Sequence, residues 1–319
     1  MDDVVIAAEG LTRAFGATLS VDRLSLEVRR GEVFGLLGHN GAGKTTTVRL
    51  LNGVLEPTSG AARVLGLAPA RDGPALRRRT GVLTETPAVD ERLTGRENLA
   101  LFAELFGVER PRVKARVEEA LSTFGLLPRA DTRVLGWSKG MRQGLALART
   151  ILHSPELFFL DEPTSGLDPV ATRGVADLIE RLCRGEGKTV FLCTHNLDEA
   201  QRLCDRVGVM RRGKLVAAGT PAELGRRLSA RVTVDVETDA ASAEAMRAAI
   251  ASQSGASAEA HLADGRATFA VHGLERAAVP GLVAAAVAAG VRLHRVAPRE
   301  PTLEDVYFSL YGVVDAEPA

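Results

Sequence analysis

The stretch GHNGAGKT, at residues 38–45, decides the fold of this chain. It follows the apolar run Val33–Leu37 and precedes a helical stretch from Thr46 to Leu51. A buried strand that turns through glycines into a helix points consecutive backbone N–H groups at one place. Together with the positive end of the helix dipole, those groups form a site for an anion. The stretch therefore predicts a phosphate-binding loop between a strand and a helix.

Two side chains of this loop extend the prediction to a particular ligand. In a loop of this pattern the lysine contacts the β- and γ-phosphates, and the hydroxyl that follows it can ligate Mg²⁺. Here these residues are Lys44 and Thr45. We therefore expect a nucleoside triphosphate bound with Mg²⁺ and a catalytic contribution from Lys44. The residues expected to hold the nucleotide are Gly38, Asn40, Gly41, Ala42, Gly43, Lys44, Thr45 and Thr46.

Composition places the chain among ordinary globular proteins. It has 319 residues, 45% hydrophobic and 25% charged, with a formal net charge of +0. This balance argues against broad electrostatic attraction to nucleic acid or to anionic lipid. The three cysteines are not in a C-x-x-C spacing, which favours free thiols in a cytosolic compartment. The apolar stretch Gly281–Val291 is too short to span a bilayer, so any membrane span is expected in another chain.

The order of elements predicts two domains. Residues 1–226 alternate strands and helices around a helical insertion from Leu93 to Leu152, which predicts an α/β core. Residues 227–319 are expected to form a small α+β accessory or regulatory domain. Its strands and helices read β-α-β-β-α-β, which suggests a ferredoxin-like fold.

Further candidate residues follow two other predicted strands. Leu157–Leu160 is followed by Asp161 and Glu162, and the strand from Thr189 is followed by His195. The carboxyl ends of parallel strands meet at one edge of a sheet, so these side chains are expected beside the phosphate loop. Asp161 is expected in the Mg²⁺ shell. Glu162 is expected to polarise the attacking water, and His195 to contact the γ-phosphate.

These motifs together resemble the ATP-binding cassette of ABC transporters, over the stretch from Val4 to about Leu224. The resemblance includes residues 137–141 as the signature element, although Trp137, Lys139 and Met141 depart from the family's Leu-Ser-Gly-Gly-Gln. It implies that ATP is the nucleotide. In the family the signature binds the γ-phosphate of ATP held by another cassette. The resemblance thus implies a dimer of cassettes, expected to be a homodimer, with Ser138 and Gly140 contributing to the partner's site. Asp168 is also expected to bind the nucleotide.

Two further positions follow from the same resemblance. Glu85 stands where the family normally has Gln, and it can contact Mg²⁺ or water through its oxygen atoms. Phe15 stands where the family commonly has a Tyr that stacks on adenine, and a phenyl ring can also stack.

Residues near the end of the chain resemble one particular subgroup of this family. Residues 301–307 resemble the terminal motif of bacterial drug- and antibiotic-export ATPases of the daunorubicin-resistance type. This implies an ATP-hydrolysing subunit at the cytoplasmic face of the membrane, acting with a membrane-spanning permease subunit and without nucleic acid. The alternative is a soluble ABC-type ATPase that acts on ribosomes or DNA. A P-loop kinase would leave residues 137–141 unexplained.

Overall fold

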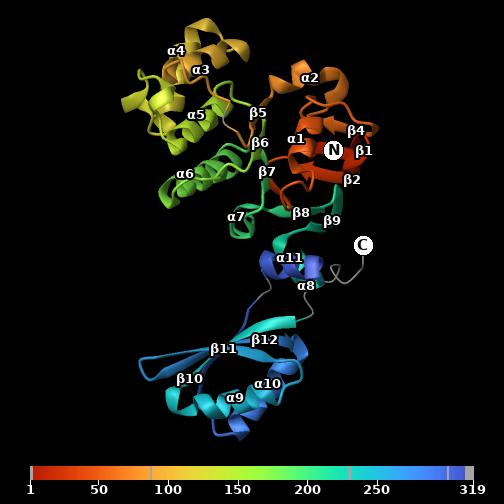
Figure 1. Cartoon of the computed structure of the whole chain (residues 1–319), viewed down its shortest axis with the longest axis vertical. Helices are drawn as coiled ribbons and strands as arrows, with labels where there is room; N and C mark the ends of the chain where they lie inside the picture. Colours follow the sequence, from red (N-terminus) through yellow and green to blue (C-terminus); the bar gives the residue numbers. More distant parts are fainter. Residues whose placement is uncertain (1–2, 87, 229–230, 300–301, 313–319) are drawn as a thin grey trace. The chain divides into compact units, whose positions relative to one another are not determined.

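The structure is a computed structural model that describes residues 3–86, 88–228, 231–299 and 302–312 (Figure 1). Its contacts divide the chain into two compact units, Met1–Gly219 and Thr220–Ala319. The division lies somewhat before the one expected after residue 226, which would fall inside helix α8 (Pro221–Leu228). Pro301, the first residue of the terminal motif, lies outside the described residues.

A six-stranded sheet forms the centre of the first unit. Its order is β5 (Thr80–Leu83), β6 (Leu157–Asp161), β7 (Thr189–Thr194), β3 (Val33–Leu37), β8 (Arg206–Arg211) and β9 (Lys214–Gly219). The strands from β5 to β8 are parallel, and β9 runs antiparallel to β8. Every residue of β3, β6 and β7 is buried, as expected for apolar runs covered on both faces. The carboxyl ends of these three strands therefore share one edge.

A second, antiparallel sheet packs with helix α1 (Lys44–Leu51) and the central sheet in one hydrophobic core. Its order is β2 (Thr18–Arg29), β1 (Val4–Phe15) and β4 (Ser59–Val64). Residues 29–31 therefore connect two different sheets instead of closing a hairpin between β2 and β3. Register shifts around Gly10 let the strand β1 continue from Val4 to Phe15.

A layer of helices has a hydrophobic core of its own (Figure 1). It consists of α3 (Gly95–Leu105), α4 (Arg110–Thr123) and α5 (Lys139–Ile151). Trp137 is buried there and donates a hydrogen bond from Nε1 to Thr132 Oγ1 at 3.0 Å. Its ring lies against Gly95, where an added Cβ would come within 2.5 Å of a ring carbon. Three more helices complete the unit: α2 (Pro69–Arg77), α6 (Pro169–Glu180) and α7 (Leu197–Leu203).

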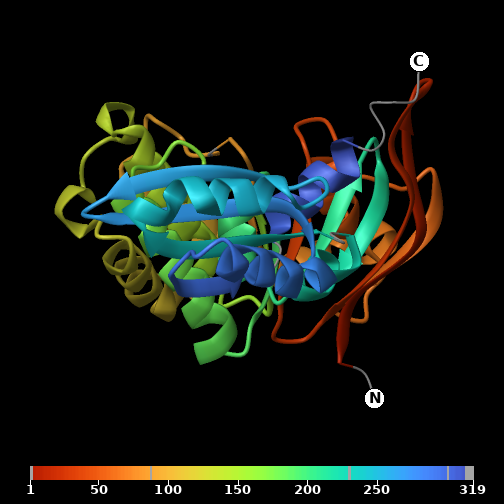
Figure 2. The same ribbon diagram turned by 90° about the horizontal axis from the view of Figure 1, so that it is seen from below.

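The second unit contains a four-stranded antiparallel sheet in the order β11-β12-β10-β13. Along the chain its elements are β10 (Arg231–Asp239), α9 (Ala243–Ala251), β11 (Ser257–Ala263), β12 (Arg266–Glu275), α10 (Val279–Ala288) and β13 (Leu293–Pro298). Helices α9 and α10 cover one face of the sheet (Figure 2), and the apolar side chains of the strands point toward them. Helices α8 and α11 (Leu303–Gly312) pack against each other in the same unit.

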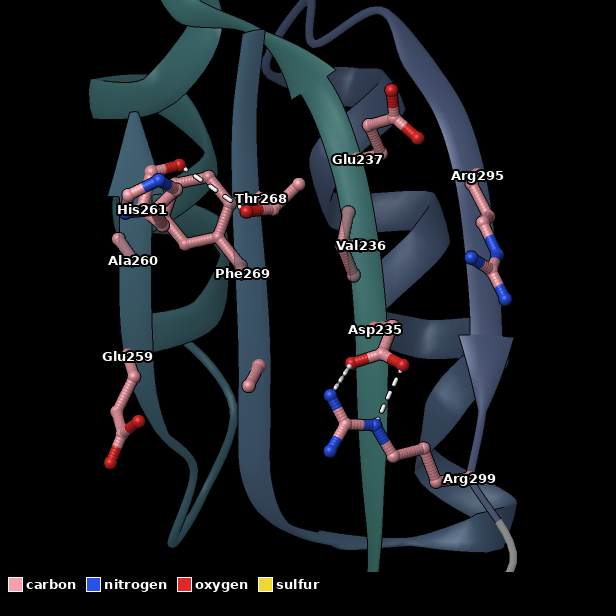
Figure 3. Close-up of a pocket in the computed structure, with 11 residues that line it drawn as sticks. Asp235, Val236, Glu237, Glu259, Ala260, His261, Thr268, Phe269, Arg295 and Arg299 are labelled. Carbon is pink, nitrogen blue, oxygen red and sulfur yellow. Dashed lines mark hydrogen bonds and ion pairs between the residues drawn. The ribbon is translucent and has the colours of Figure 1, made fainter. Parts of the chain in front are cut away.

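The other face of this sheet is polar (Figure 3). Alternation along β10 places Asp235 and Glu237 there, while Val234 and Val236 lie in the core. Asp235 accepts two hydrogen bonds from the guanidinium of Arg299. These groups line an open hollow of about 400 Å³.

Candidate nucleotide-binding site

The phosphate loop has the backbone shape that its glycines permit. Gly43 has φ +107°, and a Cβ there would lie 2.3 Å from the carbonyl oxygen of Ser20, so no other residue fits. Gly41 also has positive φ, at +83°. Helix α1 begins at Lys44, directly after the loop and two residues before the expected Thr46. The first turn of α1 therefore points its free backbone N–H groups into the loop.

Lys44 lies under this loop and is held in place before any ligand binds. Its Nζ donates to the carbonyl oxygen of Gly38 at 2.6 Å and lies 3.6 Å from Oε1 of Glu162. Only 6% of the residue is exposed. A buried ammonium with one carboxylate nearby is well placed to accept further negative charge from a phosphate group.

A hollow of about 220 Å³ lies over the loop. It is lined by Ser20, His39, Asn40, Gly41, Gly43, Lys44, Thr45, Thr46, Glu85, Asp161 and Glu162. The structure thus brings the phosphate loop together with both carboxylates expected at the end of β6. Ser20 was not expected: it arrives from β2, and its hydroxyl donates to Thr46 Oγ1 at 2.8 Å. No local pattern in the sequence marks it.

The residues expected around Mg²⁺ fit that ion. Thr45 Oγ1 donates to Asp161 Oδ2 at 2.7 Å, and Glu85 lines the same hollow. Burial raises the pKa of Asp161; the Thr45 hydrogen bond opposes this, while the Glu162 carboxylate raises the pKa further. Crowded, buried carboxylates need a cation beside them, and hydroxyl and carboxylate oxygens are ligands that Mg²⁺ accepts. When bound, the ion would neutralise charge on the phosphates.

Glu162 is held in an unusual backbone conformation beside Lys44. Its φ is +49°, in the left-handed region that a side chain seldom adopts, and only 7% of it is exposed. Such strain is often found at functional sites. Oε1 lies 2.8 Å from Nδ1 of His195, whose side chain is exposed. The three residues from three loops thus meet at the edge where β3, β6 and β7 end.

Four other expected residues do not reach this hollow within one chain. Ser138 caps α5 by accepting a hydrogen bond from Met141 N at 3.2 Å. Asp168 caps α6 in the same way, accepting from two backbone N–H groups. Ser138, Gly140 and Asp168 line a separate hollow of about 370 Å³, which shares no lining residue with the first. Phe15 is 47% exposed, with the Arg13 guanidinium 4.7 Å from its ring centre.

This arrangement identifies the class of protein to which the chain belongs. A strand, phosphate loop and helix, with an acidic pair at the end of a nearby parallel strand and a helical layer beside them, form a P-loop nucleotide-binding cassette. A family model described as ABC transporter matches residues 21–165. The chain belongs to the ABC transporter family, among its ATP-binding proteins, and it is an ATPase of that family.

One relative matches nearly the whole chain, and others match about two thirds of it. It is 38% identical over 312 residues to the daunorubicin resistance ATP-binding protein DrrA3 of Streptomyces coeruleorubidus, covering 98% of this chain and 97% of that protein. It is 40% identical to the bacitracin transport ATP-binding protein BcrA of Bacillus licheniformis, covering 66% of this chain and 68% of BcrA.

Solved structures support the same family. One titled as the ATP-binding subunit of an ABC transporter has TM-score 0.64 and 32% identity, covering 70% of this chain and 92% of its own. The cbiO1 protein of Clostridium perfringens, described as part of an ABC transporter complex, has TM-score 0.62 and 27% identity, covering 71% and 95%. Among the described residues, no helix is long and apolar enough to cross a membrane.

Proposed function

We propose that this chain powers a bacterial exporter of drugs, antibiotics or other hydrophobic compounds by binding and hydrolysing ATP between two cassettes. The observation that carries the proposal is the hollow in which Lys44, Thr45, Asp161 and Glu162 meet. The named relatives in Streptomyces and Bacillus serve resistance to daunorubicin and transport of bacitracin. The similarity to DrrA3 along the full length supports the same type of cargo here.

Each side chain of the hollow has a role in this proposal. Lys44 and the N–H groups of the loop bind the phosphates, and Thr45 with Asp161 would hold Mg²⁺, assisted by Glu85. Glu162 accepts a proton from the attacking water, since its carboxylate lines the same hollow as the phosphate loop. His195 lies 2.8 Å from that oxygen, where it can contact the γ-phosphate.

A second cassette completes the site in this proposal. Ser138, Gly140 and Asp168 line a hollow of their own, away from the phosphate loop of the same chain. Their helix N-termini and hydroxyl are suited to a phosphate group presented by another copy. Beside them, Val170 is 83% exposed, an apolar side chain available to a dimer contact. We expect ATP to join two copies of this chain head to tail, with Phe15 stacking on adenine.

The membrane-spanning partner would contact the surface around Glu85 and the helical layer. Two apolar side chains of α3, Leu101 and Leu105, are 46% and 66% exposed there. In this proposal the chain works at the cytoplasmic face of the membrane and moves the permease as the cassettes close. The alternative, action on ribosomes or DNA, is disfavoured by the formal net charge of +0. Cross-linking in cells tests both: a membrane protein as the partner supports export, whereas ribosomal or DNA partners contradict it.

Two substitutions test the chemistry. Lys44→Ala should abolish ATP binding, because a buried ammonium is removed from beneath the phosphates. Glu162→Gln should bind ATP normally and dimerise with it, but hydrolyse it roughly 10²- to 10⁴-fold more slowly, the usual loss for a general base. Isothermal titration, size-exclusion chromatography with ATP and phosphate release provide the three readouts. Normal hydrolysis by Glu162→Gln would exclude Glu162 as the base.

A further inference from the structure

A second buried carboxylate lies behind Glu162. Glu199 is on α7, and only 5% of it is exposed. Its Oε2 lies 3.0 Å from Thr194 Oγ1, and the same hydroxyl lies 3.5 Å from Oε2 of Glu162. Thr194 is the last residue of β7, directly before His195. One hydroxyl therefore bridges two carboxylates, only one of which faces the phosphate hollow.

The Thr194 hydroxyl has one proton to donate and two lone pairs to accept with. One lone pair receives the backbone N–H of Asn196 at 3.0 Å. If Glu199 were ionised, the single proton would go to this nearer carboxylate. Oε2 of Glu162 would then face a lone pair. If Glu199 is neutral, its own O–H donates to Thr194, and Thr194 donates to Glu162. Only the second arrangement gives Oε2 of Glu162 a donor from Thr194.

The surroundings of Glu199 favour its neutral form. Burial raises the pKa of Glu199; hydrogen bonds from the Thr194 and Thr164 hydroxyls act against this, and the charge of Glu162 raises the pKa further. Arg202, on the same helix, is the cation that lowers it. Two carboxylates joined through one hydroxyl in a buried site seldom both carry charge. Of the two, Glu162 has the ammonium of Lys44 beside it, 3.6 Å from Oε1.

We propose that Glu199 is a positioning residue for ATP hydrolysis: acting through the Thr194 hydroxyl, it fixes Oε2 of Glu162 and so holds the carboxylate in the orientation that hydrolysis needs. Glu199 is not among the residues that line the phosphate hollow. It works as a hydrogen-bond donor, so it needs an N–H or O–H at this place and not a negative charge. The inference rests on the proposed role of Glu162 as the base.

Substitutions that keep or remove the donor test this in the full-length chain. Glu199→Leu and Thr194→Val should each lower kcat about 10- to 100-fold while the KM for ATP changes less than about threefold, because a base displaced by a fraction of an ångström loses rate and not substrate binding. Glu199→Gln supplies an N–H donor, and Thr194→Ser keeps the hydroxyl. These two variants should retain at least about a third of the wild-type kcat.

The double variant Glu199→Leu with Thr194→Val should be no slower than the slower single variant, because both changes break the same chain of bonds. Thermal melting of each variant identifies any general loss of folding. If Glu199→Gln is as slow as Glu199→Leu, a working carboxylate is required and the inference is wrong. Normal kcat in Glu199→Leu also overturns it. Normal hydrolysis by Glu162→Gln would instead remove the proposed base itself.

Discussion

At the scale of single residues, Gly140 has no steric reason within its own chain to be glycine. A Cβ there would meet Leu167 Cδ2 at 3.8 Å and Ser138 Oγ at 4.0 Å, which are ordinary contacts. Its φ is not in the left-handed region either. The absence of a side chain at Gly140 leaves room for another group to approach the start of α5, and we have proposed that this group is the nucleotide of a second cassette.

Gly140→Ala should therefore slow hydrolysis without weakening the fold. Removing a glycine from a helix typically stabilises it by about 0.5–1 kcal/mol, so denaturant unfolding should show equal or greater stability. ATP-dependent dimerisation should weaken and the ATPase rate should fall about tenfold or more. Gly281→Ala is the matched control, a glycine inside helix α10 that has similar free space and does not line this hollow. Equal ATPase rates for both variants would argue against the partner contact.

Residue roles could be predicted from the sequence where a short pattern sets the geometry. Lys44 and Thr45 lie where the loop predicts, because the strand, the turn and the helix are contiguous. Ser20, Thr194 and Glu199 could not be found in this way. Each reaches the site by packing of a distant element, and serine, threonine and glutamate at isolated positions are usually ordinary surface or capping residues.

At the scale of elements, the long strongly patterned segments were predicted well and the irregular ones were not. The fully buried strands β3, β6 and β7 read as continuous apolar runs. Helix α2 escaped prediction because it contains Gly73 and Pro74 and has a kink at Asp72. Tertiary packing overrides such weak local preference. Helix α6 had usable signals, since Asp168 caps it and Pro169 is its first residue.

We expect the ion pair between Asp235 and Arg299, which links β10 to the residue after β13, to stabilise the fold less at low pH. The guanidinium of Arg299 (β13 side) holds the pKa of Asp235 (β10) below its usual value of 3.8 (Figure 3). A lowered carboxyl pKa stabilises the fold above pH 3.8, and this contribution is lost as the pH falls through the lower folded value. Arg299 is 57% exposed, so the pair contributes only about 0.5 kcal/mol.

Asp235→Asn should thus lower the free energy of unfolding by about 0.5 kcal/mol at pH 7 and hardly at all near pH 2. Denaturant unfolding of both proteins across this range measures the difference. High salt should shrink it at pH 7, because the pair is largely in solvent. A difference that grew toward low pH would contradict the assigned pairing.

At the scale of the whole molecule, each unit has hydrophobic cores built from its own described residues. The cores around α1 and in the helical layer use residues before Gly219, and the core of the C-terminal sheet begins at Val232. The β-α-β-β-α-β order of the second unit could be predicted from the sequence, because its strands alternate polar and apolar residues and its helices are rich in alanine. The point of division was expected after residue 226, inside α8, whereas it precedes that helix.

A chain ending at residue 219 should therefore fold and bind ATP, since both of its cores are intact. Circular dichroism, cooperative melting and ATP titration of this fragment test the expectation. A fragment ending at residue 226 is the comparison, because it keeps most of α8 without α11. Aggregation of both fragments, with no cooperative transition, would mean that the first unit needs residues of the second.

The packing of Trp137 against Gly95 limits how the signature element can be exchanged between ATPases of this family. An indole fits at the start of the signature because the residue opposite has no side chain, so the two positions form one exchangeable module. A signature element with leucine at position 137, placed in this chain, would leave a void beside Gly95. This chain's signature element, placed in a relative with alanine at the position of Gly95, would cause a clash between that alanine and the indole ring. Chimaeras should carry both positions together.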